Sequence, residues 1–301
     1  MTATTDQGLD RGGVTAALSA FVFWGLVPIY YKALETVGSW EVLAHRIIWS
    51  VPILLLFLAI RDGRQFWGKL RLPLNSIVWL FLSGMVLSLN WLVFVWAVAN
   101  EHILDTSLGY FGSPLVSVLL GYLVLKERLS TLRVVAVLLA AAGTFFLAWF
   151  LGRPPWIAIT LALSWGAYGL LRKRLDVGPM LGLLWETILM LLPALGYIMW
   201  LSARSDQQFL HSSPGIDLLL VGSGLVTVLP LIWFNMAAKK LPLSILGFFQ
   251  YLTPSMSFMI AVYLFGERFT FGHAVAFGCI WLALALVSFE TVHRARRSQR
   301  V

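Results

Sequence analysis

The sequence is poor in charge and in cysteine. Charged residues make up 12% of its 301 residues. Soluble domains carry about 25%, so the composition excludes an ordinary soluble globular domain. Cys279 is the single cysteine, which excludes an internal disulfide framework and a metal cluster built on cysteines. The sequence contains no Walker-type glycine loop, so ATP is not expected as the energy source within this chain. We expect neither a cofactor nor a bound metal.

Long apolar runs take the place of the missing charge. Hydrophobic residues make up 59% of the chain, and its mean hydropathy is +0.83. Runs of roughly 20 residues recur, each long enough to cross a hydrocarbon core about 30 Å thick. The prediction is an all-α, polytopic membrane protein with ten transmembrane helices. The predicted spans are 14–34, 40–60, 75–99, 103–125, 132–151, 155–172, 179–201, 216–238, 242–265 and 271–291.

The distribution of Lys and Arg predicts the orientation of these spans. With the N-terminus placed in the cytoplasm, most basic residues fall in the inside segments, as the positive-inside rule requires. Both termini are therefore expected to be cytoplasmic. Because topology accounts for the net charge of +8, we expect no nucleic-acid partner. The basic residues expected outside are only Lys32, Arg153, Arg204 and Arg268.

An internal repeat divides the chain into two halves. The segments SPLVSVLLGYLVLKERLS (113–130) and TPSMSFMIAVYLFGERFT (253–270) align without a gap. Each copy holds five spans, an odd number, so the copies enter the membrane from opposite sides. Such inverted repeats are typical of secondary transporters with a site near the middle of the membrane. The predicted organisation is a cytoplasmic tail (1–13), a first five-helix repeat (14–151), a second five-helix repeat (155–291) and a basic cytoplasmic tail (292–301).

Charged side chains inside predicted spans point to the chemistry, because burying them in a bilayer is costly. Arg46 and Glu186 are the clearest cases, although Arg46 can also extend its long side chain to the outer interface. His45 has an ordinary pKa near neutral pH, which suits proton coupling, but a purely structural role is the alternative. A repeat alignment shifted by one residue places Glu186 opposite His45. We predict that both carry protons, whereas Glu41 lies near the outer end of its helix, where it can contact water.

Aromatic, polar and proline residues complete the predicted site. Trp24 and Trp165 correspond in the repeat and each precedes a glycine, although tryptophans also serve as interfacial anchors. Intramembrane polar groups either position a ligand or hold helices together. Pro114 and Pro254 correspond as well, and we predict that they are hinges. The candidate substrate-binding residues are Trp24, Tyr31, His45, Arg46, Asn90, Tyr110, Trp165, Tyr168, Glu186, Thr227, Gln250 and Tyr251.

Six segments spread over nearly the whole chain carry a family resemblance. They are WGLVPIYYKAL, AHRIIWS, NWLVFVWAV, SLGYFGSPL, LLRKRL and LGFFQYLTP, in this order. Together they resemble the RarD proteins of the drug/metabolite transporter (EamA) superfamily. One departure is Ser113, where the family pattern has Asn before the proline. The resemblance implies a ten-helix carrier of the cytoplasmic (inner) membrane, in a superfamily whose members move amino acids, metabolites and drugs.

We therefore predict a secondary active transporter that moves a small metabolite or drug-like solute by alternating access, with proton coupling as a hypothesis. Two alternatives stay open, an intramembrane enzyme and a scaffold or receptor that transports nothing. An enzyme would need a nucleophile beside a base, or clustered metal ligands, and the five histidines are scattered, so we expect no enzyme. The expected partners are a small-molecule substrate and the lipid bilayer, and a homodimer is left open.

Overall fold

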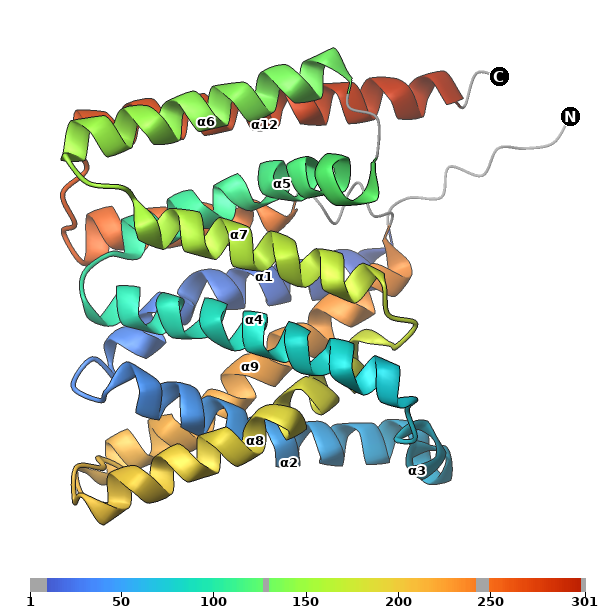
Figure 1. The fold of residues 1–301 in the computed structure, drawn as a ribbon, viewed down its shortest axis with the longest axis vertical. Coiled ribbons are helices and arrows are strands. Elements are labelled where there is room, and N and C mark those ends of the chain that lie inside the picture. Colours follow the sequence, from blue (N-terminus) through green and yellow to red (C-terminus); the bar gives the residue numbers. More distant parts are fainter. Residues whose placement is uncertain (1–9, 127–129, 242–248, 299–301) are drawn as a thin grey trace, which may run out of the picture. The chain divides into compact units, whose positions relative to one another are not determined.

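Every regular element in the described part of the chain is a helix (Figure 1). The computed structural model describes residues 10–126, 130–241 and 249–298. The elements are α1 (Arg11–Lys32), α2 (Ser39–Asp62), η1 (Gly63–Gln65), α3 (Phe66–Lys69), α4 (Leu74–Ala99), α5 (Ile103–Leu125), α6 (Thr131–Leu151), α7 (Trp156–Lys173), α8 (Pro179–Ala203), α9 (Pro214–Lys240), α11 (Leu252–Met259), the π-helical η2 (Ile260–Leu264) and α12 (Phe271–Ser298).

The helices confirm the all-α membrane fold with its ten apolar helices. Eight of them are long and apolar enough to cross a membrane. The other two are α7, which has 18 residues, and the shorter apolar run Leu252–Leu264 formed by α11 and η2. The first part of the predicted ninth span, 242–248, lies outside the described residues.

Local sequence signals set several helix ends. The Asp10 carboxylate accepts a hydrogen bond from the Gly13 backbone N–H at 2.6 Å, and this bond holds the pKa of Asp10 below its ordinary value. Ser130 and Ser213 cap α6 and α9 in the same way. At its other end α6 stops at Gly152, whose left-handed backbone (φ 66°) terminates the helix. These helix ends therefore follow from capping residues that can be recognised in the sequence.

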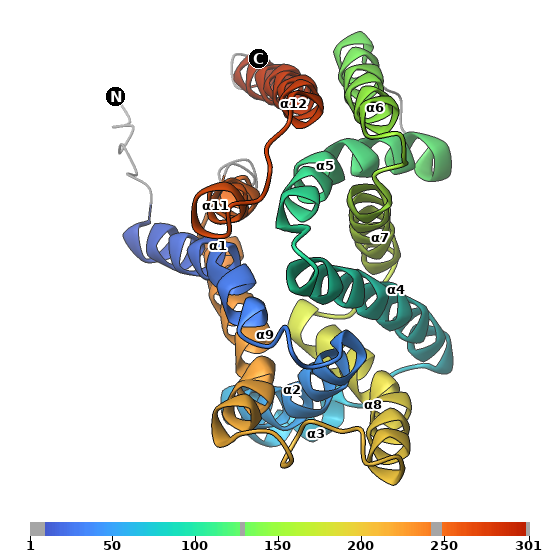
Figure 2. The same ribbon diagram turned by 90° about the vertical axis from the view of Figure 1, so that its left-hand side faces the viewer.

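The helices form two compact units, and each unit takes helices from both sequence repeats. Unit 1 comprises residues 1–85 and 176–260, in which α1 packs on α9 and α11, and α2 packs on α8 and α9. Unit 2 comprises residues 86–175 and 261–301, in which α5 packs on α7, and α6 packs along α12. Figure 2 shows α6 beside α12, two helices that lie at the ends of the two repeats. The α4 helix contributes its first half to unit 1 and its second half to unit 2.

The two prolines predicted as hinges occupy different positions in their helices. Pro114 lies in the interior of α5, whereas Pro254 lies in the first turn of α11, just after a turn at Tyr251. Proline is tolerated in a first turn because its missing N–H has no partner there in any case. The interior proline of α5 leaves a carbonyl without its usual donor. The corresponding helices of the two repeats therefore differ in their continuity at this point.

Candidate functional site

In unit 1, three of the predicted residues meet around a buried guanidinium. Arg46 of α2 is 9% exposed, and its Nε donates a hydrogen bond to Thr227 Oγ1 of α9 at 2.7 Å. The Thr227 hydroxyl in turn donates to the Ser223 carbonyl one turn earlier, at 2.9 Å. The ring of Tyr31 from α1 lies 5.5 Å from the guanidinium carbon. Arg46 is thus held by α1 and α9, and its side chain does not extend along an exposed surface.

A glycine on α9 brings α2 and α9 close enough for this contact. A Cβ placed on Gly224 would overlap the backbone of Trp49 and would lie 2.8 Å from the Ser50 nitrogen. Only a residue without a side chain fits there, so α9 crosses directly against the backbone of α2. This crossing lies about one turn from Arg46 and from Thr227, so the two side chains of the hydrogen bond come from the closely packed part of α2 and α9.

His45, the neighbour of Arg46, has one satisfied ring nitrogen and one that is unsatisfied. Trp49 Nε1 donates to His45 Nδ1 at 3.2 Å, so the neutral ring carries its hydrogen on Nε2. Within the described part of the chain, that buried Nε2 has no hydrogen-bond partner. Phe209 covers the ring, with the two ring centroids 4.6 Å apart. A buried donor without an acceptor is unusual and requires an explanation.

Glu186, the predicted acidic residue of α8, is 1% exposed and pairs with a residue of α4. Ser83 Oγ lies 2.6 Å from Glu186 Oε1 and 3.1 Å from the Leu80 carbonyl oxygen. A Cβ on Gly84 would lie only 3.2 Å from the Glu186 carbonyl oxygen, so this glycine permits the close approach of the two helices. The Ser83–Gly84 pair corresponds in the repeat to Ser223–Gly224, the pair beside Arg46.

In unit 2, four other predicted residues form a polar and aromatic group. Asn90 of α4 donates from Nδ2 to Ser164 Oγ at 2.9 Å, and its Oδ1 accepts from the Tyr110 hydroxyl at 3.1 Å. The Tyr110 ring meets Trp165 edge to face, with centroids 6.2 Å apart. Tyr168 follows at 5.8 Å from Trp165. Three helices, α4, α5 and α7, supply this group.

The remaining predicted residues lie elsewhere in unit 1. Trp24 packs on Phe21 at 5.5 Å and on Phe234 at 5.9 Å, and it borders a buried apolar cluster between α1 and α9. These apolar neighbours favour a packing role for Trp24. Gln250 is exposed and Tyr251 is partly buried, directly after a segment outside the described residues.

Glu41 has a function in the fold that the sequence did not reveal. The expectation that it contacts water is wrong, because Glu41 is 2% exposed. Its Oε1 accepts hydrogen bonds from the backbone N–H groups of Gln208 and Phe209, at 2.8 and 3.1 Å. No local pattern indicates a bond between residues so distant in the chain.

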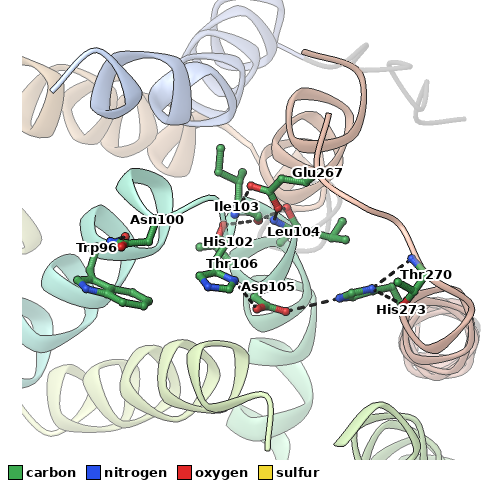
Figure 3. A network of polar contacts seen from close by, with 11 residues as sticks. Trp96, Asn100, His102, Ile103, Leu104, Asp105, Thr106, Glu267, Thr270 and His273 are labelled. Carbon is green, nitrogen blue, oxygen red and sulfur yellow. Dashed lines mark hydrogen bonds and ion pairs between the residues drawn. The ribbon is translucent and has the colours of Figure 1, made fainter. Parts of the chain in front are cut away.

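A second carboxylate, that of the partly buried Glu267, binds backbone N–H groups in unit 2. Glu267 follows η2, and its two oxygens accept from the N–H groups of Ile103 and Leu104 at 2.7 and 2.8 Å, as Figure 3 shows. These N–H groups belong to the first turn of α5, which has no intrahelical acceptors for them. Burial raises the pKa of Glu267 above its ordinary value, against the opposing effect of the two hydrogen bonds. Glu267 lies in the second of the two aligned repeat segments, but the alignment does not indicate this role.

Next to Glu267, Asp105 lies between two histidines (Figure 3). Its Oδ2 lies 3.3 Å from His102 Nδ1, and its Oδ1 lies 3.8 Å from His273 Nε2. The His102 ring stacks on Trp96, with centroids 5.8 Å apart. Among the described residues, no three His, Cys, Asp or Glu side chains are grouped so that they could hold a metal ion.

Comparison with known proteins identifies the family. The sequence profile of the EamA-like transporter family matches residues 11–149 and 154–289. The chain belongs to this family. An uncharacterized transporter of Vibrio cholerae serotype O1 is 42% identical over 98% of this chain and 99% of its own length. Protein RarD of Escherichia coli K12 is 38% identical, and the alignment covers 98% of this chain and all of the relative.

Further relatives agree with this assignment. Protein RarD of Streptomyces exfoliatus is 41% identical over 96% of this chain and 92% of its own length. The chain is therefore a member of the RarD family within the EamA superfamily, and the predicted resemblance is confirmed. A solved crystal structure at 18% identity superposes with a TM-score of 0.61, covering 92% of this chain and 97% of the other. That likeness concerns the fold alone.

Proposed function

We propose that this protein is a secondary active transporter that moves a small metabolite or drug-like solute across the cytoplasmic membrane by alternating access. Both termini face the cytoplasm in this proposal. The observation that carries it is the buried Arg46, held by Thr227 and beside Tyr31 in an apolar membrane helix. A charge at such a position is costly to the fold, and it is characteristic of binding sites and ion pathways.

The chemistry around Arg46 selects the part of the solute that binds there. A guanidinium has five N–H donors in a planar fork, and it pairs best with carboxylates and other planar anions. We propose that an anionic or zwitterionic group of the solute binds Arg46 beside the Tyr31 ring. The group around Asn90 and Tyr110 offers hydrogen bonds and aromatic surface, and we propose a solute contact for it as well.

Glu186 is proposed as the coupling-proton site, with His45 as a second candidate. Ser83 has one hydroxyl hydrogen and two acceptors in reach, Glu186 and the Leu80 carbonyl. When Glu186 is ionised, Ser83 donates to it. When Glu186 is protonated, the carboxyl group donates to Ser83, and Ser83 donates to Leu80. Both protonation states are therefore satisfied, as a group that gains and loses a proton within a membrane requires.

The inverted repeat supports an alternating mechanism. Two copies of opposite orientation can exchange conformations, which opens the site to each side of the membrane in turn. We propose that Pro114 and Pro254 allow the bending that this exchange needs, because Pro114 removes a backbone donor inside α5 and Pro254 lies beside the turn at Tyr251 where α11 begins.

Uptake into proteoliposomes with an imposed pH gradient tests the proposal. The panel consists of labelled amino acids, aromatic metabolites and anionic drug-like solutes. We expect accumulation of at least one solute, and its loss in Arg46→Ala. Arg61→Ala is the control, because Arg61 ends the same helix at an exposed position, where it pairs with Asp62. Binding without flux would instead indicate a receptor, and conversion of the solute would indicate an enzyme.

A further inference from the structure

The segment between α8 and α9 lies across His45. Phe209 of this segment packs its ring, in a tilted orientation, with its centroid 4.6 Å from that of the His45 ring and 6.4 Å from that of the Trp49 ring. The segment joins two membrane helices at the end of unit 1 where α2 begins, which is the outer end in the proposed topology. Phe209 lies at the centre of residues 207–211 of this segment.

Two carboxylates hold this segment by its backbone. Glu41 accepts from the N–H groups of Gln208 and Phe209, and Asp217 accepts from the N–H of Leu210 at 2.7 Å. Hydrogen bonds to ionised carboxylates are roughly twice as strong as those between neutral groups. Leu210 also has a left-handed backbone (φ 64°), which a residue with a side chain adopts only when its surroundings enforce it. Residues 207–211 are therefore held in place mainly by side chains of α2 and α9.

The atom beneath this cover is an unused hydrogen-bond donor. Trp49 occupies His45 Nδ1, and the buried Nε2–H has no acceptor within the described part of the chain. An unpaired buried donor is unfavourable in a protein core, but it suits a binding site in which a ligand supplies the acceptor. The next residue, Arg46, is the proposed binding residue for the solute.

We propose that residues 207–211 form a gate over His45, with Phe209 as the plug and Glu41 as the latch. When the latch releases, Phe209 leaves the His45 ring, and Nε2–H can donate to an oxygen acceptor of the solute. The role of the solute rests on the proposed function, whereas opening and closing of the gate do not. A permanent packing contact between Phe209 and His45 is the competing explanation.

Cysteine labelling tests the gate without any solute. Cys279 is first replaced by Ala, and His45→Cys is then the single thiol target. A membrane-impermeant maleimide is added to intact cells and, separately, to inverted vesicles. We expect slow labelling of the His45→Cys parent, and a rate at least about tenfold higher, from the outside, when Glu41→Ala or Phe209→Ala is added, because the closed population falls.

Glu267→Ala in the same His45→Cys background is the matched control. Glu267 holds two backbone N–H groups just as Glu41 does, but it belongs to unit 2, whereas His45 belongs to unit 1. Its labelling rate should stay near that of the parent. A similar rise in Glu267→Ala would show general loosening and would overturn the gate, as would unchanged rates in the Glu41 and Phe209 variants.

Two further measurements keep the test decisive. If Glu41→Ala does not yield a monodisperse protein, Glu41→Gln takes its place, because it keeps an oxygen acceptor while losing the charge. We then expect a labelling rate between those of the parent and Phe209→Ala. If the thiol were labelled only in inverted vesicles and not in intact cells, the gate would not lie at the outer end of the protein. Because no transport is measured, these results stand apart from the uptake experiment, and a failure of either proposal is recognised separately.

Discussion

Ser83 donates a hydrogen bond to Glu186 and thereby joins α4 to α8 inside unit 1. The Oγ–Oε1 distance is 2.6 Å, and both side chains are almost fully buried. Gly84, the next residue, lets the two helices approach at the Glu186 backbone. The carboxyl group of Glu186 therefore lies where α8 meets α4. A change in its protonation state changes the hydrogen bond that joins these two helices.

Replacing Glu186 tests the proposed coupling. Glu186→Gln keeps the size of the side chain but removes the titrating group, so we expect pH-driven uptake to be lost while solute exchange continues. Ser83→Ala should change the pH profile of uptake, and Ser83→Thr, which keeps the hydroxyl, should restore it. Both are measured in proteoliposomes at a series of pH values. An unchanged profile in Glu186→Gln would make Glu186 a structural residue.

Replacing Arg46 by Lys tests the proposed solute contact. Lysine keeps the positive charge but has no Nε–H to bind Thr227 and no planar fork for a carboxylate. Hydrogen bonds to charged groups contribute about 1.5–3 kcal/mol, so we expect the affinity for the solute to fall by about tenfold or more. Binding isotherms measure this. Thr227→Ser retains the hydroxyl and should bind nearly as well as the unchanged protein.

Trp24 and Trp165 should behave differently from each other. Trp24 is partly buried against the apolar cluster of α1 and α9, so Trp24→Ala should lower stability, by less than the ~3–5 kcal/mol that is usual for truncating a fully buried tryptophan. Trp165→Ala should reduce uptake while the protein stays monodisperse. Thermal melting and uptake are measured on the same preparations. Equal losses of stability in both variants would give Trp165 a packing role too.

Gly224 should not tolerate a side chain. An added methyl group would overlap the backbone of α2 at Trp49, so Gly224→Ala should destabilise unit 1 by about 1–3 kcal/mol, the usual cost of overpacking. Gly169→Ala is the matched control, because a Cβ at Gly169 of α7 meets no atom within 4 Å. The control should be neutral or slightly stabilising. Melting temperatures in detergent measure both variants.

The stabilising effect of Glu267 should depend on pH. Burial raises its pKa in the folded state above the ordinary value of 4.5, so the protonated form is favoured by folding. The contribution of this group is fully present below that ordinary value, and it declines as pH rises through the raised pKa. The melting temperature relative to Glu267→Gln should therefore be higher at acidic than at neutral pH. The reverse trend would mean that the hydrogen bonds from Ile103 and Leu104 dominate.

The sequence by itself determined the class of fold, the family and the residues most costly to bury. Hydrophobic length and composition decide whether a segment can cross a membrane, and both are local properties of the chain. Arg46 and Glu186 could be identified in the same way, because a charged residue within an apolar run stands out in the sequence whatever its neighbours in the fold. The repeat in the sequence also pairs Ser83–Gly84 with Ser223–Gly224.

Only the tertiary structure decided which residues these groups meet. From the sequence we expected Glu41 to contact water, whereas in the structure it accepts hydrogen bonds from the backbone N–H groups of Gln208 and Phe209. Nor did the repeat show that each compact unit combines helices from both halves. Such pairings depend on how closely two helix backbones can approach, as Gly224 and Trp49 do. That fit is a property of two surfaces together, and neither segment alone contains it.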